Sequence, residues 1–400
     1  MNIRWTTIVF LLISVHPALA QKEDTDLKIF GYFQNQFQYN RCKQMDQEQT
    51  TFNLQQMNLF LQKELNAQWN SFISIEFINS YSSFYKWGAF NLEEAWVRYR
   101  RSKEFNLKFG LQVPIFNNLN EIKNRTPLLP YVIRPLAYET SFKDFISVDE
   151  LVPSQAFIQA YGYFPIGNIK FDHAVYVGNS PNINSDTPYT QTGVDTSTSF
   201  LVGGRFGLRF QNLKIGASVT YDKANQIEQE IFGQLENSVE YQSASLDSAS
   251  LERLYNLAGG LHEMKRVRGG FDITYDYRDL SIESELISVY YQEDLPHANF
   301  NKHFFYITLG YRVTERLFTY LSAWSTDENR IWTDFTPSGK IDYFSGDVDV
   351  QVPNIGFSYH ISDRITFKGQ FAHVKISSDL PNVYPTTKSV YIESALSVMF

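Results

Sequence analysis

Cysteine is almost absent from this 400-residue chain: Cys42 stands alone, so no disulfide can form within the molecule. Long hydrophobic runs are also missing after the N-terminal region, although 43% of the residues are hydrophobic. A membrane-spanning helix needs about 20 consecutive apolar residues, so the pattern excludes a helical membrane protein. A basic excess is lacking too, because 35 Lys and Arg face 43 Asp and Glu. The resulting net charge of −8 argues against a nucleic-acid partner.

Motifs for catalysis or metal binding are missing as well. The seven histidines are scattered, and none has the H-E-x-x-H spacing of a zinc-binding helix. No G-x-S-x-G nucleophile elbow occurs. The glycine-rich run at 203–207 continues a strand pattern instead of opening a helix, so it does not predict a phosphate-binding loop. We therefore expect no enzyme, no metal and no cofactor. A barrel enzyme that pairs a serine with a strand histidine is the alternative.

The N-terminal region has the three-part order of a secretory signal. Arg4 supplies a positive charge, residues 8–15 form an apolar core, and Ala18-Leu19-Ala20 is a small-residue cleavage site. The apolar core is too short for a spanning helix. We expect a signal peptide over residues 1–20 and a single exported domain over residues 21–400. A buried N-terminal helix is the alternative.

Alternation between apolar and polar residues dominates the chain after position 26. Leu27, Ile29 and Phe33 fall on one face of an extended segment, whereas Gln34 and Gln36 fall on the other. Aromatic residues make up 16% of the chain, which suits strands with one face toward lipid and one toward water. A soluble β-sandwich or propeller is the alternative, but a propeller needs an internal repeat that the sequence does not show. The alternation recurs near residues 57–62, 73–77, 95–100, 105–112, 202–210, 215–221, 271–277, 305–312, 365–371 and 390–400.

The connections between these segments alternate in length. Short turns are expected near 66–68, 101–104, 165–167, 211–212, 278–279, 314–315 and 362–363. Longer polar loops are expected near 41–51, 80–88, 114–153, 179–197, 222–265, 292–300, 326–346 and 376–386. The pattern predicts an all-β fold: a transmembrane antiparallel β-barrel of about 16 strands with short periplasmic turns and long extracellular loops. A barrel of this size leaves an aqueous channel, whereas a plugged transporter needs about 22 strands and a plug domain.

The end of the sequence continues the alternation. Val390, Ile392, Leu396 and Val398 alternate with polar or small residues up to Phe400. A last strand that ends in Phe resembles the signal that the outer-membrane assembly machinery recognises, so we expect this machinery as a partner through Phe400. A final strand that merely has an aromatic end is the alternative. Trp69, Trp87, Trp96, Trp324 and Trp332 are expected in belts at the membrane edges.

Two neighbouring segments carry a family resemblance. Residues 92–99 read Leu-Glu-Glu-Ala-Trp-Val-Arg-Tyr, and residues 107–114 read Leu-Lys-Phe-Gly-Leu-Gln-Val-Pro. Together with Arg134-Pro135-Leu136 and Tyr138-Glu139, they resemble the phosphate-selective porin O and P family of Gram-negative outer-membrane porins. The motif match covers about residues 88–140. The resemblance implies a homotrimer of water-filled, sixteen-stranded pores, each narrowed by its third long loop and passing small solutes, including phosphate or other anions.

The connection 114–153 is the candidate for that loop. It is long and rich in proline and apolar residues, and structureless loops of this length are usually functional. We expect it to fold inward as a constriction; an ordered extracellular cap is the alternative. A barrel enzyme and a structural or adhesive barrel without an open pore are the alternative functions to passive diffusion through the outer membrane.

Charged residues on the inferred water-facing side are the candidate pore lining. A ring of such charges sets ion selectivity, and we expect a modest anion preference. The competing interpretation is that the charges pair across strands and stiffen the wall. The proposed pore-lining or constriction residues are Glu76, Glu94, Arg98, Arg100, Lys108, Arg125, Arg134, Lys143, Arg205 and Arg209.

Overall fold

The computed structural model describes residues 27–42, 47–78, 89–123, 125–138, 155–180, 199–224, 264–292, 300–335, 341–379 and 386–400. The expected signal peptide 1–20 and the candidate Lys143 lie outside these ranges. Among the described residues, no helix combines the length and apolar character needed to cross a membrane.

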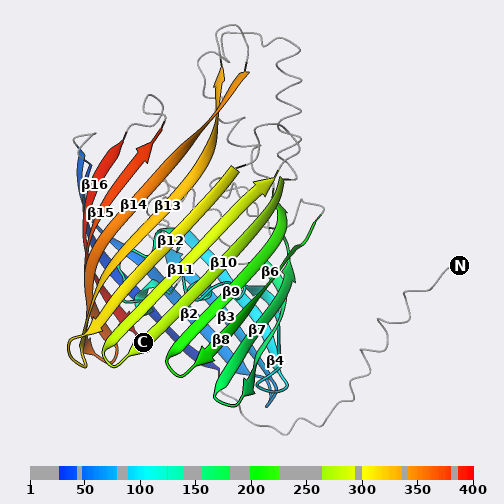
Figure 1. Ribbon diagram of the computed structural model, residues 1–400. Coiled ribbons are helices and arrows are strands. Elements are labelled where there is room, and N and C mark those ends of the chain that lie inside the picture. Colours follow the sequence, from blue (N-terminus) through cyan, green and yellow to red (C-terminus); the bar gives the residue numbers. More distant parts are fainter. Residues whose placement is uncertain are drawn as a thin grey trace, which may run out of the picture.

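Sixteen strands within the described residues close into a barrel (Figure 1). Each strand pairs antiparallel with its neighbours in sequence, and the first strand pairs with the last. The predicted fold class is therefore confirmed. The strands are β1 (Lys28–Cys42), β2 (Gln47–Glu64), β3 (Trp69–Ile78), β4 (Ala89–Arg100), β5 (Asn106–Gln112), β6 (Gln155–Ile166), β7 (Ile169–Gly178), β8 (Leu201–Phe210), β9 (Leu213–Ala224), β10 (Met264–Tyr277), β11 (Leu280–Gln292), β12 (Phe300–Arg312), β13 (Leu317–Phe335), β14 (Ile341–Ser362), β15 (Ile365–Ser378) and β16 (Thr387–Met399).

The two faces of the barrel wall follow the alternation of the sequence. On β8, Phe206 points outward and is exposed, whereas its neighbour Arg205 points inward and is buried. On β10, Phe271 is exposed and Asp272 is buried in the same way. Successive side chains of a strand point to opposite faces, so one apolar residue in two is enough to coat the outside. The outer surface is consequently apolar over most of the strand length.

The short turns lie where the sequence predicts them. Gln211 and Arg278 adopt positive φ angles of 49° and 54° in two of these turns. The long-loop end differs from the prediction at two places. β13 and β14 remain paired out to Phe335 and Ile341, so most of the expected loop 326–346 is a hairpin that rises above the neighbouring strands (Figure 1). Likewise β2 begins at Gln47, inside the expected loop 41–51. These strand ends resemble loops in the sequence because their residues are polar. Backbone pairing continues there although the outer face no longer needs apolar side chains.

The seam of the barrel involves the last residue. The backbone N–H of Phe400 donates to the Gly31 carbonyl, and the Gly31 N–H donates to the Phe400 carbonyl, both at 3.0 Å. The Phe400 ring lies 6.5 Å from the ring of Phe33 on the outer face. β1 and β16 are thus locked together by the terminal aromatic residue.

Candidate functional site

The segment that follows β5 lies inside the barrel over residues 113–123 and 125–138; we call it the lumenal segment. Its backbone N–H groups at Asn118 and Leu119 donate to Glu285 of β11 at 2.9 and 2.8 Å. Those at Val132 and Ile133 donate to Gln370 of β15 at 2.9 and 2.8 Å. β11 and β15 are each six strands from β5 around the barrel, so a segment that leaves β5 and reaches both strands crosses the lumen, as the cyan and teal coil in Figure 1 does.

A buried lysine holds the middle of the lumenal segment. Lys368 of β15 points inward, and its Nζ donates to the carbonyls of Thr126 and Pro127 at 2.8 and 3.1 Å. It also donates to Gln34 Oε1 at 3.1 Å. The carbonyls belong to a short 3₁₀ helix, η3 (Thr126–Leu128). A buried ammonium group needs such acceptors, so Lys368 serves as an anchor and is not available to solutes.

A tight turn docks the lumenal segment onto β9 and β10. Asn117 has a positive φ of 51°, and its N–H donates to Ser218 Oγ at 2.9 Å. Its side chain lies against Gly270, where an added Cβ would come within 2.1 Å of Asn117 Oδ1. Gly270 therefore provides the notch that accepts the turn.

The inner wall from β11 to β15 is largely apolar, contrary to the expected polar inner face. Leu129, Tyr131, Ile133, Leu136 and Tyr138 of the lumenal segment pack against this wall and are buried. The segment is thus held by a hydrophobic core inside the barrel. The wall residues of this core are Ile287, Val289, Tyr291, Phe304, Tyr306, Tyr320, Trp324, Val348, Val350, Val352, Ala372, Val374 and Ile376.

A row of aromatic rings crosses the inner wall from β1 to β4. Tyr32, Phe60, Phe72 and Trp96 have successive ring centroids 5.2, 5.5 and 5.1 Å apart. Lys108 Nζ lies 4.6 Å from the Trp96 ring centroid, a cation–π geometry. The aromatic row therefore packs against neighbouring charged side chains such as Lys108.

Two of the tryptophans expected at the membrane edges are inside instead. Trp96 belongs to the aromatic row, and Trp324 is buried in the core under the lumenal segment. Trp96 shares its face with Glu94 and Arg98, so the alternation already pointed it inward. Trp69 faces outward at the start of β3, while Trp87 and the side chain of Trp332 lie outside the described part of the chain.

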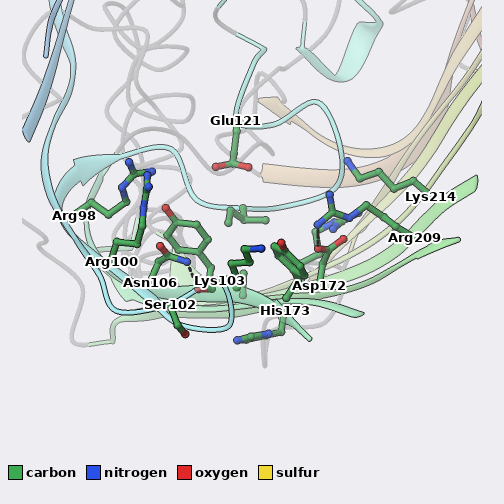
Figure 2. A pocket seen from close by; sticks show the side chains of 16 residues that line it. Arg98, Arg100, Ser102, Lys103, Asn106, Glu121, Asp172, His173, Arg209 and Lys214 are labelled. Carbon is green, nitrogen blue, oxygen red and sulfur yellow. Dashed lines mark hydrogen bonds and ion pairs between the residues drawn. The ribbon is translucent and has the colours of Figure 1, made fainter. Parts of the chain in front are cut away.

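A cavity of about 450 Å³ separates the lumenal segment from the wall of β4–β9. Figure 2 places Arg98 and Arg100 on one side and Arg209 and Lys214 on the other, with Glu121 of the lumenal segment reaching between them. The turn between β4 and β5 contributes to the lining, so the cavity lies toward the short-turn end of the barrel. Cations outnumber acidic groups along its wall. The charged lining residues are Arg98, Arg100, Lys103, Glu121, Asp172, Arg205, Arg209 and Lys214.

Several of the predicted pore residues are engaged in pairs. Arg205 Nη2 donates to both carboxylate oxygens of Asp272, at 2.6 and 2.9 Å. Room for this pair comes from Gly216, where a Cβ would approach Arg205 to 2.1 Å. Arg209 pairs with Asp172. These pairs fit the interpretation in which opposite charges stiffen the wall.

The acidic candidates are also engaged. Glu94 accepts a hydrogen bond from Trp96 Nε1 at 2.8 Å and lies 3.2 Å from Arg125 Nη2. Glu76 accepts a hydrogen bond from Gln56 at 2.8 Å. The pair between Glu94 and Arg125 connects β4 to the lumenal segment, so these residues position the segment.

Arg98 and Arg100 are the candidates most available to a solute. Arg98 uses its Nε to donate to Asn70 at 2.9 Å, which leaves its terminal nitrogens facing the cavity. Arg100 is exposed to the cavity. Arg98 and Lys108 are direct cross-strand neighbours of like charge, an arrangement that costs stability. Arg134 is not part of the lining of this cavity, and it donates to the Lys123 carbonyl at 2.5 Å within the lumenal segment.

The prediction missed Glu121 in the cavity. The alternation placed Glu285, Lys368 and Gln370 on the inner face, but nothing in the sequence showed that they anchor the lumenal segment. It also placed Arg266 and Arg268 on the channel side, whereas both are buried and contact Asp222, at 2.9 and 3.3 Å. Within the described residues, no three His, Cys, Asp or Glu side chains are grouped to hold a metal ion.

Comparison with known proteins finds structural but not sequence similarity. No family model and no curated protein matches the chain. An anion-selective porin from Comamonas acidovorans superposes with a TM-score of 0.60 at 11% identity, covering 94% of this chain and 100% of that one. The outer membrane channel DcaP of Acinetobacter baumannii gives 0.55 at 10% identity, with 94% and 97% covered.

A third structure is described as the trimer form of OmpT, an outer membrane protein of Vibrio cholerae. It gives a TM-score of 0.52 at 10% identity and covers 94% of this chain and 99% of that one. At these identities the similarity concerns the fold alone. The chain has the closed-barrel fold of outer-membrane porins.

Proposed function

We propose that this protein is a passive diffusion channel for small hydrophilic solutes in the outer membrane of a Gram-negative bacterium. The observation that carries the proposal is the contrast between the two faces of the closed barrel. The outer face is apolar along the strands, whereas the inner face borders a charged cavity of about 450 Å³. Such a barrel suits a water-filled pore through lipid. The printed descriptions of its structural neighbours as porins and a channel support the proposal.

We propose that the lumenal segment is the constriction. Its contacts with β9, β11 and β15 hold it across the lumen, and its apolar side chains are already covered by the inner wall. Solutes would then pass between the segment and the wall of β4–β9. Residues 139–153 of the expected loop lie outside the described part of the chain, and for them the alternative of an extracellular cap stays open.

The expected selectivity is a modest preference for anions. Arg98, Arg100 and Lys103 line the cavity without an acidic partner among the described residues, while Arg205 and Arg209 are offset by Asp272 and Asp172. Salt screens charges in water beyond a Debye length of about 8 Å at physiological ionic strength, so the preference should weaken in concentrated salt. Phosphate is one anion that would fit, and the resemblance of residues 88–140 to phosphate-selective porins supports testing it first.

We propose no catalytic activity for this barrel. The side chains of Ser288 and His303 lie 3.0 Å apart on the outer face, an arrangement similar to part of a hydrolase site. The surrounding backbone N–H groups are engaged in the pairing of β10, β11 and β12. Among the described residues, we therefore find no pair of free N–H groups beside Ser288 that could stabilise an oxyanion.

The remaining expectations fit an exported channel. We propose removal of residues 1–20 as a signal peptide, recognition of Phe400 by the assembly machinery, and assembly into homotrimers like the trimer form described for the Vibrio cholerae neighbour. The resemblance to phosphate-selective porins supports the trimer as well.

A planar-bilayer experiment tests the channel proposal. Purified protein should produce discrete conductance steps, and a salt gradient should give a reversal potential of the sign for anion preference. A heat-modifiable barrel that never conducts would support a structural or adhesive role. A cation-selective reversal potential would overturn the anion preference while leaving the channel intact.

A further inference from the structure

Glu121 of the lumenal segment projects its carboxylate into the cavity described above. This carboxylate makes no hydrogen bond and no ion pair with any described residue. Figure 2 nevertheless shows it between two groups of cations, with Arg98 and Arg100 on one side and Arg209 and Lys214 on the other. An anion preference makes no use of this carboxylate, because a fixed negative charge repels anions.

Hydrogen bonds of the neighbouring residues fix the turn that carries Glu121. The backbone N–H of Ile122 donates to the Leu119 carbonyl at 3.0 Å. Asn120 Nδ2 donates to the Pro114 carbonyl at 2.9 Å. These contacts set the position from which Glu121 reaches into the cavity. A carboxylate that is held in place by its neighbours is pre-organised to accept hydrogen bonds from a solute.

Cations without an acidic partner lie on both sides of Glu121. Arg98 and Arg100 line the cavity and form no ion pair with any described residue. On the opposite side, Lys214 donates to the neutral amide of Asn118 and likewise forms no ion pair with a described residue. The cavity therefore offers two positions for anionic groups, with one carboxylate between them.

This order of charges is complementary to a solute that carries two carboxylates and an ammonium group on the carbon chain between them. An inorganic anion contacts the wall cations only. A dicarboxylate without an amine brings its own negative charges close to Glu121, which disfavours it. The cavity volume of about 450 Å³ lies in the range of sites for small ligands.

We propose that the cavity is a binding site for amino acids with an acidic side chain, within the permeation path of the channel. One carboxylate of the solute contacts Arg98 and Arg100, the other contacts Lys214, and the ammonium group donates to Glu121. The inference rests on the proposed function and adds recognition of one solute class to the general anion preference. Charge-assisted hydrogen bonds of both signs make the site selective, because any other solute leaves one protein charge without a partner.

Blockage of single-channel current in planar bilayers by L-glutamate and by glutarate tests the site. The two solutes differ only in the amino group. The excess of cations alone favours glutarate, because glutarate carries the larger negative charge. Recognition of the ammonium group by Glu121 acts in the opposite direction, so the half-saturating concentration of L-glutamate should be about tenfold lower than that of glutarate. Equal values, or tighter blockage by glutarate, would overturn the inference.

A pair of matched variants assigns this preference to one side chain. Glu121→Gln should raise the half-saturating concentration of L-glutamate about tenfold and abolish its advantage over glutarate. Asp172→Asn removes the same charge from the lining of the same cavity, so it measures the nonspecific effect of net charge. This control should still bind L-glutamate more tightly than glutarate. Loss of the preference in both variants would contradict the inference.

The carboxylate contacts are tested separately. Arg98→Gln combined with Arg100→Gln should weaken blockage by both solutes and leave their order unchanged. L-Alanine lacks the second carboxylate, so it should block the unmodified channel only at a higher concentration than L-glutamate. Equal blockage by L-alanine and L-glutamate would overturn a site for two carboxylates.

The same recordings distinguish this inference from the proposed function. Stable conductance in potassium chloride without saturable blockage by L-glutamate overturns the binding site and leaves the diffusion channel intact. A heat-modifiable barrel that never conducts overturns the channel, and the binding site in its permeation path with it.

Discussion

The inner walls of β4–β10 and of β11–β15 are built from different residues, although their outer faces are alike. The first wall carries Arg98, Arg205 and Asp172 in the lining of a cavity. The second carries Val289, Val350 and other apolar residues under the lumenal segment. Contact with lipid requires apolar side chains over the whole outer face. The composition of the inner face depends on its local contact, which is the cavity in one half and the lumenal segment in the other. On the proposed function, most of the apolar contacts that hold the lumenal segment come from β11–β15, whereas the charges expected to set selectivity lie on β4–β9.

Removing the lumenal segment should give the largest effect on conductance, because both inner walls would then face water. Deleting residues 118–136 exposes the apolar wall of β11–β15 to water and clears the cross-section of the lumen. Single-channel conductance should rise severalfold, while heat modifiability on gels confirms that the barrel still closes. Unchanged conductance in a closed barrel would show that the permeation path does not run past this segment.

Removing one anchor should loosen the segment without deleting it. Lys368→Met keeps the length of the side chain but withdraws the donor from the carbonyls of Thr126 and Pro127. We expect noisier current and a conductance increase smaller than that of the deletion. Lys63→Met, on an exposed lysine of β2, is the control and should behave like the unmodified channel. Equal records from the two variants would mean that the segment is held without Lys368.

Charge changes on the basic wall should alter selectivity and leave the conductance path in place. Arg98→Ala combined with Arg100→Ala removes two cations that line the cavity, so the reversal potential should move toward cation selectivity. The matched control combines Arg205→Met with Asp272→Asn, which removes a buried ion pair with no change in net charge. That control should retain the original reversal potential. A shift of equal size in both variants would locate selectivity outside the cavity.

A pH change should produce the smallest effect. Burial in the lumenal segment raises the pKa of the Glu121 carboxyl above its ordinary value of 4.5. The carboxyl therefore becomes neutral at a higher pH than an exposed glutamate, and the cavity becomes more positive as the solution is acidified. Anion preference should therefore increase on acidification, and the increase should begin at a higher pH than the titration of an exposed glutamate would give. Glu121→Gln should remove most of this dependence, and a pH response that persists in this variant would assign it to another group.

The fold could be predicted from the sequence because lipid contact constrains every second residue of every strand. The same alternation placed Arg205, Lys368 and Gln370 on the inner face. The alternation does not by itself show which face of a strand meets lipid. Val348, Val350 and Val352 alternate with Asp349 and Gln351, and the valines would be suited to an outer face in contact with lipid.

The valines in fact face inward and are buried in the hydrophobic core. This part of β14 lies toward the long-loop end, where the outer face tolerates polar residues. The sequence also did not show which inward-facing side chains pair with one another. Arg205 and Asp272 are 67 positions apart in sequence, and only the register of β8, β9 and β10 brings them together. No local pattern encodes which inward-facing groups will meet across three strands.

The seam between Gly31 and Phe400 has a consequence for the order of assembly. These residues exchange two backbone hydrogen bonds at opposite ends of the described chain, so every other strand pair can form before this one. Until then β1 and β16 are open edges of the sheet, which readily pair with other chains. Closing a loop of this length is slow because its entropy must be lost before the contacts form. A nascent barrel therefore has a long-lived, sticky edge, and its escape from aggregation depends on how quickly Phe400 reaches Gly31.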